Sequence, residues 1–151
     1  MNRENNDNKD IKEKKEVKKQ EVKDIEKKVK EEKIEKIKDQ REEILEKTGR
    51  EYFSSALDEE KKGRYNSAVV LYFKSLASFA DLFILKKTGK SPSSHSDRFR
   101  ITREKFPEIY DLLDKDFPFY QDSYNKIMSK ELAEVIKNDT KIVAEKAEVK
   151  L

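Results

Sequence analysis

The side chains best suited to bind phosphate lie close together in the segment from Lys86 to Lys105. This segment holds seven cationic side chains against two acids, Asp97 and Glu104, so its net charge is +5. Phosphate binding needs clustered positive charge, and nearby Tyr and Phe rings can stack on bases. The candidate nucleic-acid or phosphate-binding residues are therefore Lys86, Lys87, Lys90, His95, Arg98, Arg100, Arg103 and Lys105.

The same cations also have a structural interpretation. Lys86 and Lys87 would interact with the last carbonyl groups of a helix, and Arg98 and Arg103 would be solvated or pair with acids. No RNA-binding signature accompanies the segment, so both interpretations stay open. The rest of residues 49–151 carries a net charge of −3, much of it in the four aspartates between Asp111 and Asp122.

His95 is the single histidine of the chain, and the sequence contains no cysteine. A multi-histidine metal site within one chain, Cys-ligated zinc, iron–sulfur clusters, thiol catalysis and disulfides are therefore excluded, and no metal or cofactor is expected. His95 could act as a general base or contact a phosphate, or it could have a capping or hydrogen-bonding role. The sequence does not identify a catalytic residue, and His95 is the one side chain that remains a candidate for such a role. Tyr120 and Tyr124 are expected to be core aromatics.

The composition predicts helices to position these residues. Of 151 residues, 67 are charged, 34% are hydrophobic, and Gly and Pro total six. Six turn-forming residues are too few for a β-sandwich or barrel. The first 48 residues hold 31 charges and no aromatic, whereas all 14 aromatics lie between Tyr52 and Tyr124. We therefore predict a charged arm over residues 1–48 and a helical bundle over residues 49–151.

The charged arm has many opposite charges spaced four residues apart, such as Asp24 and Lys28, each worth about 0.2–0.5 kcal/mol in an isolated helix. Val22, Ile25 and Val29 keep the 3,4 spacing of a coiled coil, but the step to Ile34 breaks it. A solvated helix that can find a partner, a coiled coil and a disordered segment all stay open. Disorder is expected for residues 1 to about 9.

The longest apolar helix is predicted from Tyr65 to Lys87, with Gly89 just beyond its end as the stop signal. It is apolar almost all round, but Lys74 and Asp81 inside it make membrane insertion unfavourable. Such a helix belongs in the middle of a bundle or against a second subunit, so a homodimer is predicted.

Local signals predict the other helices of the bundle. One helix is expected from Arg50 to Lys62, ending at Gly63, and it could continue directly from the arm. Another begins after a Ser94 cap and breaks at Pro107. A second break is expected at Pro118, followed by a short helix with Phe119, Tyr120, Tyr124, Ile127 and Met128. Ser129 would cap the last helix, whose apolar stripe is Leu132, Val135, Ile136, Ile142, Val143 and Ala147.

The order of these elements resembles the HEPN superfamily of small helical bundles. The resemblance rests on 52-Tyr-Phe-Ser-Ser-Ala-56, on 63-Gly-Arg-Tyr-Asn-Ser-Ala-68 opening the long helix, on the Ser/Pro loop before His95, and on 122-Asp-Ser-Tyr-Asn-125. It covers about two thirds of the chain and implies an up-and-down bundle of four or five helices, frequently dimeric. The Arg-x4–6-His motif of the family's ribonucleases is absent, because no arginine lies between Arg64 and His95.

The resemblance implies a non-catalytic module that binds RNA or a nucleotide, or that accompanies a nucleotidyltransferase. The alternative is a structural or adaptor protein that acts through bundle dimerisation and the helical arm. A degenerate ribonuclease using His95 with Arg98 or Arg100 is the third hypothesis. Residues Met1 to Asp10 are polar and lack the apolar core of a signal peptide, so a cytoplasmic protein without membrane contact is expected.

Overall fold

The computed structural model describes residues 2–151, with side chains from Lys9 onward. Within this range the chain is all-α, with no strand, as predicted. Its helices are α1 (Asn2–Lys61), α2 (Tyr65–Thr88), α3 (His95–Lys105), α4 (Pro107–Asp122) and α5 (Lys130–Lys146). The chain divides into two compact units, an N-terminal unit that ends at Asp39 and a bundle unit, Gln40–Leu151.

The N-terminal unit is helical, and almost all of its described side chains are exposed. Neighbouring turns are linked by surface contacts such as the Lys27–Glu31 ion pair (3.9 Å) and the hydrogen bond from Gln20 to Asp24 (2.8 Å). The disorder expected for residues 1 to about 9 concerns a stretch that lies outside the residues with described side chains.

The bundle unit begins at Gln40, ahead of the boundary predicted at residues 48/49 from composition. The reason is that α1 already packs on α2 before Gly49. Leu45 is buried, and its carbonyl oxygen accepts a hydrogen bond from Ser78 Oγ (2.8 Å). Gly49 lies inside α1, where a Cβ atom would come within 2.5 Å of the Phe79 ring, so the helix runs through the glycine at a close contact with α2.

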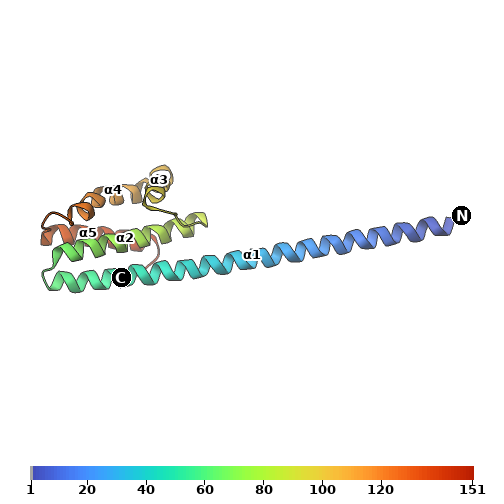
Figure 1. Ribbon diagram of the computed structural model, residues 1–151, viewed down its shortest axis with the longest axis horizontal. Helices are drawn as coiled ribbons and strands as arrows, with labels where there is room; N and C mark the ends of the chain where they lie inside the picture. The colour runs from blue at the N-terminus through green and yellow to red at the C-terminus, as the bar shows by residue number, and fades with distance from the viewer. Residues whose placement is uncertain (1) are drawn as a thin grey trace. The chain divides into compact units, whose positions relative to one another are not determined.

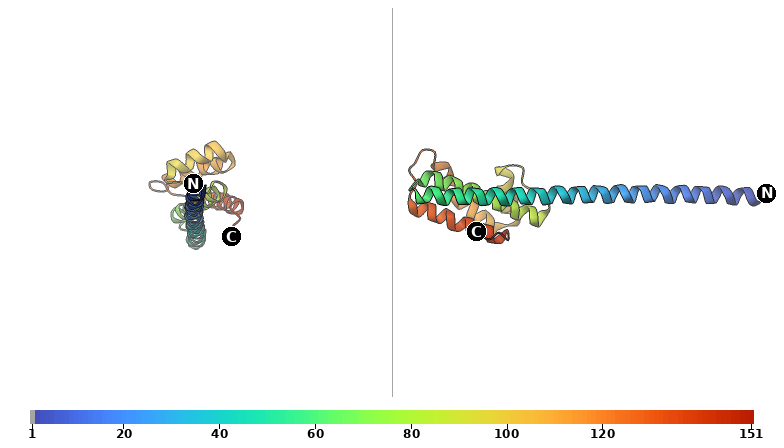
Figure 2. Two further views of the ribbon diagram at one scale, coloured as in Figure 1. Left: turned by 90° about the vertical axis from the view of Figure 1, so that its right-hand side faces the viewer. Right: turned by 90° about the horizontal axis from the view of Figure 1, so that it is seen from below.

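The bundle unit has three layers, with α2 in the middle (Figures 1 and 2). The C-terminal part of α1 covers one side of α2, α5 lies beside it, and α3 with α4 covers the other side. Most of the fully buried large side chains come from α2, including Tyr72, Phe73 and Phe79. Among the described helices, α2 is the one long and apolar enough to cross a membrane, and 83% of that stretch is buried inside the bundle.

The predicted helix signals act as expected at several ends. The Ser94 and Ser129 side chains cap α3 and α5 by accepting hydrogen bonds from the backbone nitrogens of Asp97 and Leu132. Gly89 ends α2 in the left-handed conformation, with φ of +76°. The α4 helix starts at Pro107, where its missing N–H group costs nothing.

The predicted break at Pro118 is wrong, because α4 continues through it to Asp122. Proline lacks the N–H group that would bond to the carbonyl of Asp114, but Asp114 and Pro118 are both exposed, so water can replace this bond. Phe117 and Tyr120 hold the helix in place by packing on Phe73. The short helix expected up to Met128 is also wrong, because residues 123–129 form a loop.

The predicted stripe of α5 is correct only in part. Val135 and Ile142 lie on its outer side and are 41% and 43% exposed, whereas Ile136 and Val143 are fully buried.

Candidate functional site

A guanidinium group joins α2 to the start of α3. Arg98 donates two hydrogen bonds to the Asp81 carboxylate, from Nε (2.7 Å) and from Nη2 (2.8 Å). Its third nitrogen, Nη1, lies 2.7 Å from Nδ1 of His95. Both Arg98 and Asp81 are buried. The bidentate geometry makes this a strong charge-assisted contact that also fixes the His95 ring.

The contact with Arg98 sets the tautomer of His95. A guanidinium group only donates hydrogen bonds, so Nδ1 must accept and the proton of the neutral imidazole must be on Nε2. Partial burial and the charge of Arg98 lower the pKa of His95, and the Asp81 charge opposes this only in part. His95 is therefore a neutral ring that offers one hydrogen-bond donor, Nε2–H.

A cleft of about 230 Å³ opens beside this array. Side chains from four helices line it: Leu45, Thr48 and Tyr52 of α1, Phe73, Lys74, Ala77, Ser78 and Asp81 of α2, His95 and Arg98 of α3, and Tyr120 of α4. The cleft therefore combines cationic, hydroxyl and aromatic groups in one concave surface. Such a combination is typical of ligand-binding sites.

Lys74 and the two tyrosines give the cleft its chemical character. The Lys74 ammonium lies over the Tyr52 ring, 5.6 Å from its centroid, and Lys74 is exposed. The Tyr120 ring stacks on the buried Phe73 ring at 4.9 Å, which fixes its plane. With Arg98 and Lys74 positive, Asp81 negative and His95 neutral, the cleft has a net charge of +1.

Only two of the eight residues predicted to bind phosphate, His95 and Arg98, line this cleft. Lys86 instead bonds to the Ala147 carbonyl (2.7 Å), and the Lys87 ammonium lies over the Phe83 ring. Both lysines therefore have structural contacts, but Lys86 bonds to the end of α5 and Lys87 to a ring, instead of the last carbonyl groups of their own helix that the structural interpretation named.

The other predicted cations lie along the surface of α3 and the loop before it. Arg100 pairs with Asp97 (2.6 Å) and Glu104 (3.2 Å). Arg103 donates to the Tyr110 hydroxyl (2.9 Å) and stacks on its ring. Lys90 and Lys105 are exposed and have no ion-pair partner among the described residues.

The roles of Lys74, Asp81 and Tyr52 were not predicted from the sequence. A signal was present, because Lys74 and Asp81 are the two charges inside an otherwise apolar helix, where they argue against membrane insertion. A charged side chain in such a helix must face either solvent or a buried partner. Lys74 is exposed to solvent, and Asp81 is paired with Arg98.

Two further buried polar clusters lie away from the cleft. Lys137 Nζ contacts the Glu60 carboxylate at 2.8 Å, and the Tyr72 hydroxyl donates to the same group. Burial and this hydrogen bond to Glu60 raise the pKa of Tyr72. Burial opposes the ionised form of Glu60, but the hydrogen bonds from Lys137 and Tyr72 outweigh it and lower the pKa of Glu60.

Asp116 of α4 and Asp139 of α5 form the second cluster. Asp116 is fully buried, and neither of its carboxyl oxygens has a donor partner among the described residues. Burial, followed by the Asp139 charge and hydrogen bond, raises the pKa of Asp116 to about 8. The Lys115 ammonium nitrogen lies 2.5 Å from Oδ2 of Asp139 and so brings a positive charge next to this pair of carboxyl groups. The described residues contain no group of three or more His, Cys, Asp or Glu side chains able to hold a metal ion.

Comparison of the chain with protein-family models found no matching family, and comparison with curated proteins found no significant match.

Proposed function

We propose that the bundle unit is a non-catalytic module that binds RNA or a nucleotide, and that it holds a phosphate group in the cleft between Lys74 and His95. The observation that carries the proposal is the contact of Arg98 with His95 Nδ1, which leaves the proton of the neutral ring on Nε2 as a free donor. His95 and the exposed Lys74 both line the cleft. A phosphate oxygen accepts hydrogen bonds from both kinds of donor.

The aromatic side chains support a nucleotide as the ligand class. Tyr52 and Tyr120 come from different helices and both line the cleft. Stacking of a base on an aromatic ring is worth about 1–3 kcal/mol and tolerates any base. A volume of about 230 Å³ is below the usual range for a whole drug-sized ligand, so the cleft suits the phosphate group, with the base on the surrounding surface.

The geometry argues against cleavage at this site. A general base needs an accessible lone pair, but His95 Nδ1 is held by Arg98, and the buried Asp81 carboxylate is held by two hydrogen bonds from the same guanidinium. Neither side chain is therefore well placed to take a proton from a ligand. This supports a binding role over the degenerate ribonuclease. Membership in the HEPN superfamily, a nucleotidyltransferase partner and a cytoplasmic location stay predictions.

A binding measurement with fluorescent single-stranded RNA at two salt concentrations tests the proposal. Lys74→Glu should weaken binding at least tenfold, because it reverses the one exposed charge of the cleft. Lys105→Glu is the matched control, since it makes the same charge change on the exposed surface of α3 and should lower affinity much less. If Lys105→Glu and Lys90→Glu abolish binding and Lys74→Glu does not, the site is the basic segment. If the intact chain binds neither RNA nor nucleotides, the proposal is wrong.

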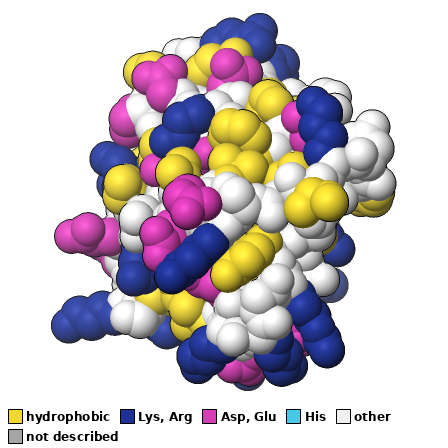
Figure 3. Space-filling model, turned by 90° about the vertical axis from the view of Figure 1, so that its left-hand side faces the viewer, with side chains coloured by type: hydrophobic (Ala, Val, Ile, Leu, Met, Phe, Trp, Pro, Cys, Tyr) yellow, Lys and Arg dark blue, Asp and Glu magenta, His cyan; other side chains and the backbone are white. Residues whose placement is uncertain are grey.

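A second candidate function, the adaptor, is favoured by the loop between α4 and α5. Tyr124 and Ile127 in this loop are 76% and 95% exposed, so the expectation that Tyr124 is a core aromatic is wrong. Yet the loop is firmly held, because Asn66 donates to the carbonyls of Ser123 (2.8 Å) and Lys126 (2.7 Å) and accepts from the Met128 nitrogen (2.9 Å). On the face of the molecule where this loop lies, Figure 3 shows several hydrophobic side chains between charged and polar ones.

An apolar side chain on a rigid support is typical of a protein-binding surface. A hollow of about 390 Å³, lined by Val70, Leu71 and Tyr124 among others, adjoins this loop. A homodimer formed through the bundle would use this surface. Light scattering should then show that Ile127→Asp makes the bundle dimer dissociate, whereas Val135→Asp on the outer side of α5 does not.

A further inference from the structure

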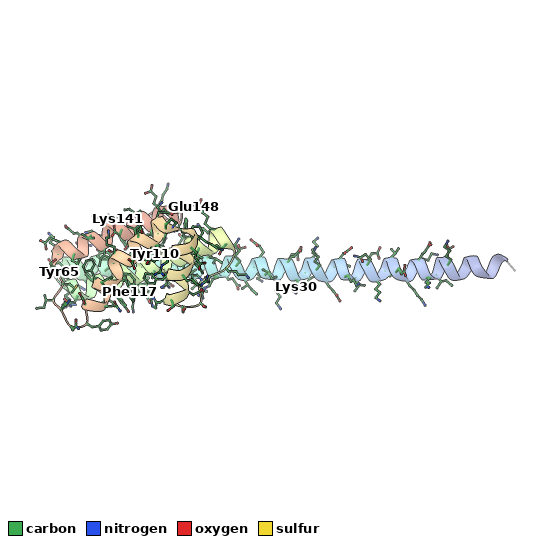
Figure 4. All side chains as sticks on the ribbon, turned by 90° about the horizontal axis from the view of Figure 1, so that it is seen from above. Lys30, Tyr65, Tyr110, Phe117, Lys141 and Glu148 are labelled. Carbon is green, nitrogen blue, oxygen red and sulfur yellow. The ribbon has the colours of Figure 1, made fainter. Side chains whose placement is uncertain are left out.

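The N-terminal unit presents a short apolar strip to solvent. Val22, Ile25 and Val29 lie three and four residues apart, which places them on one side of the α1 helix. They are between 54% and 62% exposed. Side chains stand out on all sides of this part of α1, as at the labelled Lys30 (Figure 4). A single helix cannot cover its own strip, so burial of these residues requires a second helix.

The charges beside the strip identify that second helix. Continuing the seven-residue spacing gives a seam of Ile11, Lys15, Lys18, Val22, Ile25, Val29, Glu32 and Lys36. One flank of the seam consists of Lys12, Lys19, Glu26 and Lys33. The other flank consists of Lys14, Glu21, Lys28 and Glu35.

Parallel pairing of two copies would place like charges together at the three central steps of the flanks. In a parallel pair, a residue of the second flank meets the residue five positions later on the first flank of the other copy. Lys14 would then face Lys19, and Glu21 would face Glu26. Lys28 would face Lys33 in the same way. The charge pattern therefore opposes a parallel dimer.

Antiparallel pairing reverses the outcome, because each flank then meets the same flank of the other copy. With Val22 opposite Ile25 of the second copy, Glu21 faces Lys28, and Glu26 faces Lys19. Two further contacts, Lys14 with Glu35 on the flank and Lys15 with Glu32 in the seam, are also attractive. The one repulsive flank contact is Lys12 with Lys33. Two-fold symmetry makes each contact occur twice.

We propose that two copies of the chain associate through an antiparallel pair of α1 helices over residues 11–36, centred on Val22 and Ile25. In this register Val29 is covered by the aliphatic stem of Lys18 of the second copy, whose ammonium group reaches solvent. The apolar seam is short, so opposite charges supply the specificity and the dimer is weak enough to exchange. This proposal does not depend on RNA binding by the bundle unit.

Charge reversal at Glu21 distinguishes the two orientations by sign. In the antiparallel pair, Glu21→Lys places a lysine opposite Lys28 of the other copy, and two-fold symmetry makes this repulsion occur twice. The dimer dissociation constant should therefore rise roughly tenfold. In a parallel pair, the same change would replace repulsion from Glu26 by attraction and lower the constant. The double variant Glu21→Lys/Lys28→Glu should restore the intact value. Glu16→Lys, which makes the same charge change away from the seam, is the control. Sedimentation equilibrium of the full chain provides the measurement.

Cysteine cross-linking locates the register, because the chain has no cysteine of its own. Full-length Lys18→Cys and Val29→Cys chains should form a mixed disulfide when oxidised together, and neither should cross-link to itself. The result should persist with Ile127→Asp in both chains, which removes any contribution from bundle contacts. Self-cross-linking of Val29→Cys would show parallel pairing and overturn the proposal. A lack of any cross-link at a hundred micromolar or so would overturn it as well.

Discussion

The N-terminal unit and the bundle unit use charged side chains in opposite ways. Between Lys9 and Asp39 almost all charged side chains are exposed, and the helical pairs they form are worth a few tenths of a kcal/mol each. In the bundle unit, Asp81, Arg98, Asp116 and Asp139 are buried. A buried charge depends on its partner, because losing the partner leaves the charge uncompensated in a medium of low polarity. The difference predicts where substitutions will matter.

The largest effect is expected for Arg98→Ala. It leaves the Asp81 carboxylate buried without its two hydrogen bonds, and breaking a buried pair in this way costs about 3–5 kcal/mol. Thermal unfolding should show a large fall in the midpoint. Arg100→Ala on the same helix loses only exposed ion pairs, so its midpoint should barely move. Equal effects of the two substitutions would contradict the contrast between buried and exposed charges.

A smaller loss is expected for Gly49→Ala, where α1 meets α2. Alanine normally stabilises a helix interior by about 1 kcal/mol relative to glycine. Here the added methyl group would lie 2.5 Å from the ring of fully buried Phe79, so strain should reverse the sign and cost about 1–3 kcal/mol. Denaturant unfolding measures this, with Ser54→Ala on the exposed side of α1 as the control. A stabilised Gly49→Ala variant would show that the two helices are not in close contact there.

The pH dependence of stability should change in Asp116→Asn. The pKa of Asp116 is raised to about 8 in the fold, so the folded chain binds this proton more tightly than the unfolded chain does. The free energy of unfolding therefore falls as pH rises from about 4 to about 8, and stays low above that. Between pH 7 and pH 9 the loss is about 1 kcal/mol. Asp116→Asn should remove this slope, whereas exposed Asp111→Asn should keep it.

The smallest effect is expected from removing residues 1–39. The side chains described between Lys9 and Asp39 are almost all exposed, so the thermal midpoint of residues 40–151 should change by only a few degrees. Removing residues 1–48 is the informative comparison, because it also takes away the buried side chain of Leu45 and the Leu45 carbonyl that accepts a hydrogen bond from Ser78. The longer deletion should lower the midpoint clearly. Loss of cooperative unfolding in the shorter one would contradict the two-unit description.

Local signals made much of the fold predictable from the sequence. The caps at Ser94 and Ser129, the end at Gly89 and the start at Pro107 act within a few residues, and the structure has all four. The path through Pro118 was not predictable, because the packing of Phe117 and Tyr120 on another helix decides it.

The candidate site was predicted less well for a similar reason. The basic segment pointed to His95 and Arg98, but the partner that fixes their role, Asp81, lies on the preceding helix. Nothing near His95 in the sequence indicates Lys74 or Tyr52, because three helices must pack before these side chains line one cleft. The Asp116–Asp139 pair is likewise visible only once α4 lies against α5.

The imidazole of His95 offers the most direct test of the binding proposal, since a single histidine gives one set of nitrogen signals. Long-range ¹H–¹⁵N NMR of the intact chain at pH 7.5 should show a neutral ring with the proton on Nε2, as the contact with Arg98 requires. Titration with a nucleoside monophosphate should then shift the Nε2 signal, and Lys74→Glu should abolish the shift. A proton on Nδ1, or an Nε2 signal that stays in place while RNA or nucleotide binds, would contradict the cleft as the phosphate site.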